Sequence, residues 1–583
     1  MQAGAFSTSL QKAISLHQDG MFDEAKKIYE ALLVQNSDHP DVLNLYGLLC
    51  FEEGHTERAI SLISKAVTQN PLNAQFLNNL GSVFASEAKF DLAIEQFHKA
   101  IEIEPTQVIA YENLGNALME FGKAKEAIEP YQKCIALLPV DPDGYIKLSA
   151  AFNVSGKPDK AIECLQEFLD RGNENAVVLN NLGVLLQESG DLVRAISVFK
   201  KSIDVDPQYA AAYANLATAC WENKSLDEAE VYAQKSLKLK PGLQTASTAL
   251  GLVKLAKGNI SEASQYILQP SLYFRDPETD HDPYLGAFNQ INAFKREHDI
   301  SQLEYLINNN VIAESYSTLI DEYYALGTQL KDDGRIINLS DLDKLPSDRF
   351  FSSYNRLLNF YNAPVIDQGV INPELDAASI EKAYFDNQPE FAFVDDFLTD
   401  QAISELRQFC LESTIWYDMS AIGDLGANLE DGFCCPLLLQ IADEIRKTFP
   451  SIYGEHYFST CWSYRYYAKK SGDGLHGDSG RVSVNIWLTP DEANYDPDGG
   501  GLLFWNKKVP MLKVKDNPKE MTDKIMRDII AEPDAEYFSV PYKCNRATLF
   551  NSNIIHKTDD INFRTGYENR RLNITFVFGK PEY

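Results

Sequence analysis

The stretch NNLGSVFASEAKFDLAIEQFHKAIEIEP, residues 78–105, is followed 34 positions later by ENLGNALMEFGKAKEAIEPYQKCIALLP, residues 112–139, which keeps its small, apolar and proline positions. The same register runs in both directions along the chain. Alanine recurs every 34 residues at Ala25, Ala59, Ala93, Ala127, Ala161, Ala195, Ala229 and Ala263. A second small position recurs at Gly47, Gly81, Gly115, Ser149, Gly183, Ala217 and Gly251. A period of about 34 residues predicts stacked helical hairpins.

The residue types at the repeated positions explain why such hairpins would pack. Small residues on two successive helices let the helices approach closely, and bulky residues four positions after each alanine fill the space beside them. These bulky residues are Ile63, Phe97, Tyr131, Leu165 and Phe199. Proline stops the second helix of most units. It stands at Pro71, Pro105, Pro139, Pro207 and Pro241, and Asn173 replaces it in the fifth unit. An ordinary bundle of amphipathic helices is the alternative.

This pattern resembles the tetratricopeptide repeat family over roughly residues 8–270. The resemblance implies an α-solenoid whose concave surface holds a protein or peptide partner. Asparagine also shares one register, two residues before the second small position, at Asn79, Asn113, Asn181 and Asn215, and Lys147 interrupts the series. A side-chain amide both donates and accepts, so a ladder of amides could pair with the backbone of an extended peptide.

The asparagine series resembles the ladder in the repeats of O-GlcNAc transferases, which implies that these residues bind a partner chain. The alternative is that asparagine is a tolerated polar residue on a wet helix face.

Length, composition and charge exclude several classes of protein. A chain of 583 residues is too long for one core, and 45% apolar with 23% charged residues is ordinary globular composition. The 53 Lys and Arg against 84 Asp and Glu give a net charge of −31. Nucleic acid and anionic membranes are therefore poor partners. Neither a leader in the first 30 residues nor a membrane-spanning apolar run is visible, so we expect a cytoplasmic protein.

Three regions are predicted, which makes the fold class multidomain α + β. Residues 1–270 form the solenoid, and residues 271–389, where the period disappears, form a helical connector. In residues 390–583, helices are predicted at 400–413 and 435–448, and short β-rich runs follow. These runs are 460–468, 481–489, 501–505, 537–541, 547–551 and 571–578. Several short alternating strands predict an antiparallel sandwich or barrel.

A histidine and an aspartate stand one residue apart just before the run 481–489. Residues i and i+2 of an extended segment project to the same side, so His476 and Asp478 could converge on one ion. His556 follows the run that ends at Asn551. Two histidines and one carboxylate on one face of a metal are the ligand set of non-haem Fe(II) oxygenases, which leaves positions for a cosubstrate and oxygen. A sugar- or acid-binding β-sandwich, in which His556 is incidental, is the alternative.

The last run offers a group that could hold such a cosubstrate. Arg571, Asn573 and Thr575 share one face of it. A guanidinium among polar neighbours suits a bidentate bond to a carboxylate, as on 2-oxoglutarate. Arg570 is the alternative anchor if the strand register is shifted by one. Tyr466, ten residues before His476, is either a second cosubstrate contact or a core aromatic.

The order of HxD, glycine-rich turn, second histidine and arginine resembles the 2-oxoglutarate/Fe(II)-dependent dioxygenase superfamily, closest to its prolyl-hydroxylase-like branch. The resemblance implies a double-stranded β-helix, or jelly roll. It also implies Fe(II) held by His476, Asp478 and His556, and 2-oxoglutarate held by Arg571 and Tyr466. O2 is the further cosubstrate, ascorbate is a candidate additional cofactor, and no catalytic residue is implied beyond the metal centre. Asn573 departs from the pattern, because a small hydroxyl residue is common there.

The expected function is therefore an Fe(II)/2-oxoglutarate-dependent hydroxylase acting on a protein or peptide that the solenoid recruits. One alternative is an oxygenase acting on a small molecule or glycan. Another is a non-catalytic repeat adaptor with a degenerate oxygenase domain. Residues 506–536, with Lys507, Lys508, Lys513 and Lys515, are either a substrate cover or a solvated loop. The sequence leaves the oligomeric state open.

Overall fold

The structure is a computed structural model that describes residues 2–276, 288–331, 334–419, 424–466, 469–470, 474–509 and 519–580. It divides into two compact units, Met1–Ser189 and Gly190–Tyr583. The boundary lies inside the predicted solenoid, and the two units are described separately. The predicted domain ends at residues 270 and 389 stay predictions.

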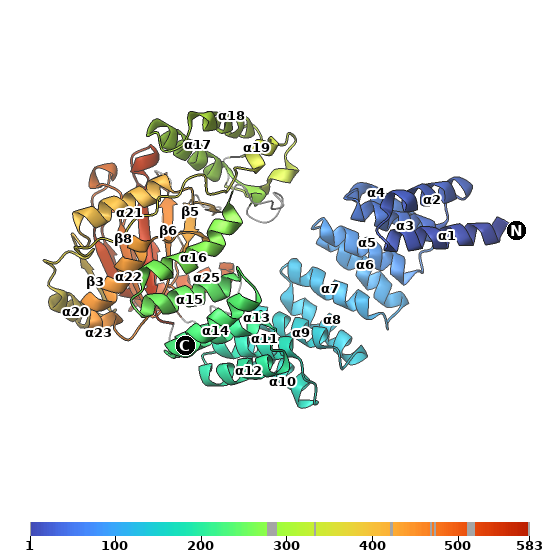
Figure 1. Cartoon of the computed structure of the whole chain (residues 1–583), viewed down its shortest axis with the longest axis horizontal. Helices are drawn as coiled ribbons and strands as arrows, with labels where there is room; N and C mark the ends of the chain where they lie inside the picture. Colours follow the sequence, from blue (N-terminus) through green and yellow to red (C-terminus); the bar gives the residue numbers. More distant parts are fainter. Residues whose placement is uncertain are drawn as a thin grey trace. The chain divides into compact units, whose positions relative to one another are not determined.

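The first unit consists of successive antiparallel helices (Figure 1, blue to cyan). They are α1 (Gln2–Gln18), α2 (Phe22–Gln35), α3 (Pro40–Glu52), α4 (Thr56–Gln69), α5 (Ala74–Ser86), α6 (Phe90–Ile103), α7 (Val108–Glu120), α8 (Ala124–Leu137), α9 (Pro142–Val154), α10 (Pro158–Asp170) and α11 (Ala176–Glu188). This succession is the series of hairpins that the period predicts.

The small repeated positions lie where paired helices approach most closely. A Cβ atom added to Gly81 would lie 2.6 Å from Cε1 of Phe97, and one added to Gly115 would lie 2.5 Å from Cε1 of Tyr131. Ala93, on the second helix of the same hairpin as Gly81, is fully buried. The bulky residue four positions after the alanine therefore packs directly on the glycine of the preceding helix, which leaves no room for a side chain.

Helix ends follow the proline positions. Helices α4, α6 and α8 end at Gln69, Ile103 and Leu137, each two residues before the proline of its unit. Proline cannot continue a helix because it lacks an N–H and clashes with the preceding turn. In the fifth unit α10 ends instead before Gly172, whose φ is +84°. A left-handed glycine just past the last turn is a common helix stop, so this unit does without proline.

The second unit begins with the remaining repeat helices, α12 (Leu192–Val205), α13 (Ala210–Glu222), α14 (Leu226–Leu239), α15 (Gln244–Ala256) and α16 (Ile260–Arg275). The last of these continues through Pro270, where the sequence predicted the solenoid to end, as far as Arg275. The buried Arg275 guanidinium donates to four backbone carbonyls, those of Asn355, Thr414, Ile415 and Asp431. The end of the repeat array is thus bonded to later parts of the same unit.

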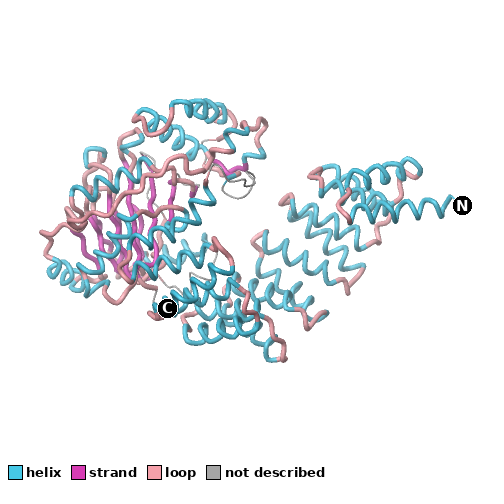
Figure 2. The backbone as a smooth tube through the Cα atoms, viewed as in Figure 1, coloured by secondary structure: helices cyan, strands magenta, loops and turns pink. Residues whose placement is uncertain are grey.

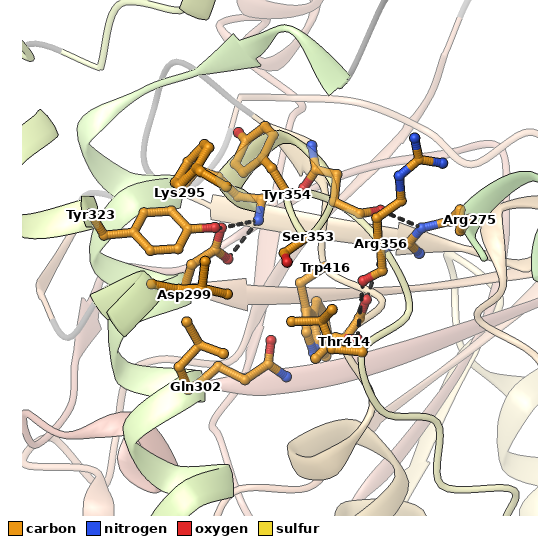
Figure 3. Close-up of a pocket in the computed structure, with 15 residues that line it drawn as sticks. Arg275, Lys295, Asp299, Gln302, Tyr323, Ser353, Tyr354, Arg356, Thr414 and Trp416 are labelled. Carbon is orange, nitrogen blue, oxygen red and sulfur yellow. Dashed lines mark hydrogen bonds and ion pairs between the residues drawn. The ribbon is translucent and has the colours of Figure 1, made fainter. Parts of the chain in front are cut away.

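The connector contains β1 (Gln290–Ile291), α17 (Ala293–Asn308), α18 (Ser317–Leu326), β2 (Ile337–Asn338), α19 (Asp348–Phe351) and α20 (Ala377–Asp386). Its interior holds a buried polar cluster (Figure 3). Lys295 forms an ion pair with Asp299, which also accepts a hydrogen bond of 2.9 Å from the Tyr323 hydroxyl. The cavity beside them measures about 30 Å³, which is room for one or two water molecules. This cavity is too small for an organic ligand.

Two antiparallel sheets dominate the rest of the unit (Figure 2). The larger has seven strands in the order β3-β11-β8-β14-β6-β5-β4, and the smaller has three in the order β10-β9-β12. Their bounds are β3 (Phe391–Val394), β4 (Asp418–Met419), β5 (Asp424–Asn428), β6 (Phe458–Tyr466), β8 (Val482–Trp487), β9 (Leu502–Lys508), β10 (Tyr537–Val540), β11 (Ala547–Asn551), β12 (Ile554–Thr558) and β14 (Leu572–Phe578). The prediction of a C-terminal antiparallel-sheet region is confirmed.

The remaining elements are β7 (Lys469–Lys470), β13 (Ile561–Asn562), α21 (Asp400–Glu412), α22 (Pro436–Thr448), α23 (Pro450–Tyr453) and α25 (Lys519–Ile530). Helices α21 and α22 match the predicted ranges to within one residue at each end. Of the insertion 506–536, Lys513 and Lys515 lie outside the described residues, whereas α25 within it is an ordered helix. As predicted, His556 follows a strand that ends at Asn551, which is β11, and it lies within the next strand, β12.

Candidate metal centre

Backbone pairing brings the HxD segment against β12. The N–H of His476 donates to the carbonyl of His556 at 2.9 Å, and the N–H of His556 donates back to the carbonyl of His476 at 2.9 Å. The N–H of Asp478 donates to the carbonyl of Ser552. Because these bonds fix the register, the ligand atoms of His476, Asp478 and His556 lie within 4.8 Å of one another. Among the described residues this is the one group of three with metal-ligand geometry.

The residue between the two ligands of the HxD segment has to be small. A Cβ atom on Gly477 would lie 2.7 Å from Cγ2 of Val509 and 3.1 Å from the carbonyl oxygen of Ser552. Val509 follows β9, so the small sheet closes over the segment. Glycine at this position therefore allows the segment to pack against its neighbours in the register that aligns the two ligands.

Hydrogen bonds orient both imidazoles. Nδ1 of His476 lies 2.9 Å from the carbonyl oxygen of Gly474, and Nδ1 of His556 lies 2.8 Å from that of Ile554. A carbonyl oxygen only accepts, so in both rings Nδ1 is the donor, and Nε2 is the ring nitrogen that remains for a metal. An outer hydrogen bond of this kind is the usual support of a metal-binding histidine.

The carboxylate of the cluster is buried and incompletely satisfied. Asp478 is 5% exposed, and its Oδ2 atom has no hydrogen-bond partner. Burial acts to raise the pKa of Asp478, but the neighbouring imidazoles of His556 and His476 outweigh it and hold the pKa below its usual value. An ionised carboxylate with an orphaned oxygen is costly in a buried site. A bound divalent cation would satisfy it, so the donor set fits a metal.

The cluster opens into a cavity of about 300 Å³. Residues from β4, β5, β6, β8, β14 and α25 contribute to its wall. The described residues that line it are Asp418, Met419, Asp424, Trp462, Tyr464, Tyr466, Gly474, Leu475, His476, Asp478, Asn485, Leu502, Asp523, Phe550, His556, Thr558, Asn573 and Thr575. Neither lysine nor arginine occurs among them.

The structure places Arg571 behind this wall rather than in it. The guanidinium is fully buried and donates to the carbonyls of Gly500 and Gly501 and to Oδ1 of Asn573. It also lies 4.7 Å from the centre of the Tyr466 ring. Because Asn573 and Tyr466 both line the cavity, Arg571 is one residue layer away from it.

The alternative anchor points elsewhere. Nη2 of Arg570 lies 3.1 Å from Oε1 of Glu297 on α17, in the connector. The hydroxyl of Tyr466 lies 3.4 Å from Oγ1 of Thr558, which also lines the cavity. Of the two arginines, Arg571 is therefore the one whose described contacts include the cavity wall.

The asparagine series has partners within the solenoid. Asn79 donates through Nδ2 to Oδ1 of Asn44 at 3.0 Å and accepts from Gln75, and Asn113 donates to Oδ1 of Asn78 at 3.0 Å. Asn79 is buried, whereas Asn113, Asn181 and Asn215 are half-buried. Where lysine interrupts the series, Lys147 pairs with Glu112. The bonds of Asn79 with Asn44, of Asn113 with Asn78 and of Lys147 with Glu112 each join residues 35 apart, so these three positions link one repeat to the next.

Sequence reasoning missed two sets of residues. The acceptors Asn44, Asn78 and Glu112 could have been found, because each stands 35 positions before its donor. The carboxylates Asp418 and Asp523 gave no local signal, because one lies about 60 residues before the HxD segment and the other about 45 after it.

Comparison with protein-family models identifies tetratricopeptide repeats. One repeat model matches residues 16–78 and 186–234, and another matches 51–107, 78–142 and 154–208. The predicted repeats are therefore confirmed over these residues, and such repeats typically bind peptides or proteins. No curated protein matches the chain. None of the described helices has the length and apolar character needed to cross a membrane.

Solved structures also resemble parts of the chain. The structure of MamA is 24% identical, with a TM-score of 0.26, and the match covers 27% of this chain and 94% of that one. YrrB, titled a TPR protein with an unusual peptide-binding site, is 22% identical over 32% of this chain and 95% of that one, with a TM-score of 0.26. PilF of Pseudomonas aeruginosa is 20% identical, with a TM-score of 0.31, and the match covers 36% of this chain and 96% of that one.

Proposed function

We propose that this protein is an Fe(II)- and 2-oxoglutarate-dependent dioxygenase that hydroxylates a protein or peptide substrate. The observation that carries the proposal is the convergence of His476, Asp478 and His556. Their ligand atoms lie within 4.8 Å of one another, both imidazoles are oriented through Nδ1, and the buried carboxylate has an unpaired oxygen. Two histidines and one carboxylate on one side of an ion are the ligand set of non-haem iron oxygenases.

The arrangement of the sheets supports the same proposal. The HxD segment precedes β8 of the seven-stranded sheet, and His556 lies on β12 of the three-stranded sheet. A ligand set shared between two antiparallel sheets is consistent with a double-stranded β-helix, whose interior lies between a larger and a smaller sheet. We therefore propose that residues 390–583 form a double-stranded β-helix.

With the cofactors bound, iron would supply the chemistry in which substrate C–H, 2-oxoglutarate and O2 give C–OH, succinate and CO2. The chain would contribute binding and orientation. His476, Asp478 and His556 would hold three positions on one side of the iron. Arg571 is the candidate for the distal carboxylate of 2-oxoglutarate. Because the carbonyls of Gly500 and Gly501 hold it one residue layer behind the cavity wall, it would act through Tyr466 and Asn573, which line the cavity.

The tetratricopeptide repeats support a macromolecular substrate. Stacked repeats offer an extended surface that suits a peptide or protein better than a metabolite. The inter-repeat bonds of Asn79 and Asn113 mean that these amides hold the surface in shape, and their remaining N–H groups and lone pairs are the part that a bound chain could use.

The test is succinate release from 2-oxoglutarate by the full-length chain with Fe(II) and O2, followed by mass spectrometry of a treated lysate. We expect succinate and a mass increase of about 16 Da on peptides, which corresponds to one added oxygen. Both should disappear in His476→Ala and remain in His456→Ala, because His456 is outside the cluster.

The other outcomes decide between the rival functions. Succinate with oxidised metabolites and unmodified peptides would favour an oxygenase of small molecules or glycans. No succinate from intact protein that contains stoichiometric iron would contradict the proposal and leave a repeat adaptor.

A further inference from the structure

The cavity that holds the proposed iron site is acidic and aromatic. Besides the ligand Asp478, its wall contains three carboxylates, those of Asp418, Asp424 and Asp523, and no lysine or arginine among its described residues. From this composition we infer that the side chain oxidised is a cationic one, lysine or arginine, on a peptide. The inference rests on the proposed function and names its substrate class.

The carboxylates are brought together by the fold and not by sequence proximity. Asp418 is on β4, Asp424 is on the neighbouring strand β5, and Asp523 comes from α25 within the insertion. Asp418 is exposed, Asp523 is half-buried and Asp424 is only 6% exposed. Like charges facing one cavity repel each other, and a cation between them would relieve this cost.

Neutralising partners for two of these groups are absent from the described part of the chain. Within it, none of the ion pairs joins Asp418 or Asp523 to lysine or arginine. The nearest described contact of Asp418 is a hydrogen bond of 3.4 Å from Nδ2 of Asn428, which is neutral. Both carboxylates can therefore form an ion pair with a positively charged ligand.

An independent feature of the wall also calls for a hydrogen-bond donor. Asn485, on β8, is 5% exposed and donates through Nδ2 to Oγ1 of Thr575 at 2.8 Å. Asn485 lines the cavity, and its Oδ1 atom is buried and has no partner among the described residues. An unsatisfied buried acceptor carries a desolvation cost that a donating ligand removes. Ammonium and guanidinium groups are pure donors.

Aromatic residues complete the wall. Trp462, Tyr464 and Tyr466 alternate along β6 and all line the cavity. A cation over an aromatic face gains electrostatic attraction from the ring, and the long aliphatic stem of lysine or arginine packs well on such rings. A proline or asparagine side chain would use the rings and leave Asp418 and Asp523 without a positive partner, so a cationic side chain fits the wall better.

The experiment compares peptide pools that differ at one position. One pair carries lysine or its neutral isostere norleucine, and a second carries arginine or citrulline. The iron-loaded, full-length protein is given 2-oxoglutarate and O2, and succinate and the added oxygen are measured separately. We expect kcat/KM to be higher for the cationic member by about tenfold or more, and the preference to weaken as salt rises.

Two variants test whether the cavity carboxylates cause this preference. In Asp418→Asn/Asp523→Asn the ratio of kcat/KM between the cationic and neutral peptides should fall by about fivefold or more. Asp528→Asn is the matched control, because Asp528 is exposed on α25 and does not line the cavity. It should keep the ratio of the unmodified chain. Calorimetry with the Mn(II)-loaded protein compares the binding affinities of the cationic and neutral peptides in the absence of turnover.

The outcomes separate the two proposals. Succinate formation with equal oxidation of cationic and neutral peptides would overturn the cationic substrate and leave the oxygenase standing. A cationic preference in Mn(II) calorimetry without any succinate from the iron-loaded protein would support the cationic site and overturn the oxygenase. Selective oxidation of proline or asparagine in peptides without a lysine or arginine would also overturn the inference.

Discussion

The Nε2 atom of His556 lies 3.6 Å from the Oδ1 atom of Asp478, and both side chains are buried. Two ligand atoms at about 2.1 Å from one divalent ion, and at right angles, are about 3.0 Å apart. The observed separation is thus close to that of adjacent ligands on one metal. A direct hydrogen bond would be shorter than 3.6 Å, so the separation leaves room for the ion that the proposed function requires.

Replacing the carboxylate should weaken metal binding more than it weakens the fold. In Asp478→Asn the ligand charge is lost while the size of the side chain is kept, so we expect the affinity for Fe(II) or Mn(II) to fall by about 100-fold. Calorimetric titration of the apoprotein measures this. His456→Ala should keep the original affinity, and unchanged affinity in Asp478→Asn would show that the cluster is not a metal site.

Arg571 should affect 2-oxoglutarate more than it affects the metal. Lysine keeps the charge but lacks the fork of N–H groups that reaches Gly500, Gly501 and Asn573 together. We expect Arg571→Lys to raise the KM for 2-oxoglutarate by about tenfold or more, with metal affinity retained. Arg570→Lys is the control, since Arg570 pairs with Glu297. A fall in thermal stability without any change in KM would assign Arg571 a purely structural role.

The glycine positions of the repeats should not tolerate a methyl group. In Gly81→Ala the new Cβ atom would overlap the ring of Phe97. We expect the free energy of unfolding of the first unit to fall by about 1–3 kcal/mol, because overpacking outweighs the better helix propensity of alanine. Urea denaturation measures this in three full-length chains: the unmodified protein, Gly81→Ala and the double variant Gly81→Ala/Phe97→Leu. The double variant should recover part of the loss, and equal stability of all three chains would contradict the packing.

The bond between Lys147 and Glu112 can be tested by exchanging the charges. Lys147→Glu places two carboxylates together, so we expect it to destabilise the first unit by about 0.5–1 kcal/mol. Adding Glu112→Lys should restore most of that stability, and a double-mutant cycle measures the coupling. Additive effects of the two substitutions would mean that the pair does not link the repeats.

Acid should destabilise the second unit through His298. Burial lowers the pKa of His298 to about 3, whereas its ordinary value is 6.5. Between these values the unfolded chain binds a proton that the folded chain does not, so stability is present above pH 6.5 and is lost as the pH falls toward 3. The slope is at most about 1.4 kcal/mol per pH unit. Urea midpoints at several pH values should show a shallower slope in His298→Gln, and identical slopes would contradict the assignment.

The repeats were predictable because their information is periodic. The contact between Gly81 and Phe97 recurs in the next hairpin as Gly115 with Tyr131, so the same small and bulky residues pack together in both hairpins. The convergence of His476 and Asp478, two of the proposed metal ligands, was predictable, since HxD spacing makes two side chains project to one side. That His556 lies on β12 itself was not, because a five-residue strand two residues after β11 gave no separate signal.

The surroundings of the metal cluster depend on contacts between distant segments. Arg571 is turned toward carbonyls about 70 residues earlier in the chain, and the strand pattern alone could not distinguish this from a guanidinium in the cavity. The cavity acids come from β4, β5 and α25, which are brought together only by the order of the strands and the position of the insertion. Such groupings are a property of topology and not of local spacing.

The bonds of Arg275 limit how the protein could be dissected or recombined. A fragment that starts at residue 390 would lack this guanidinium, and the carbonyls of Thr414, Ile415 and Asp431 would lose their donor. Grafting the sheet region onto another repeat array would therefore need a junction upstream of α12, near Gly190, so that the final helices travel with it. In this chain the last repeats and the sheet region belong to one structural unit, so the repeats cannot be removed without exposing backbone groups of the sheet region.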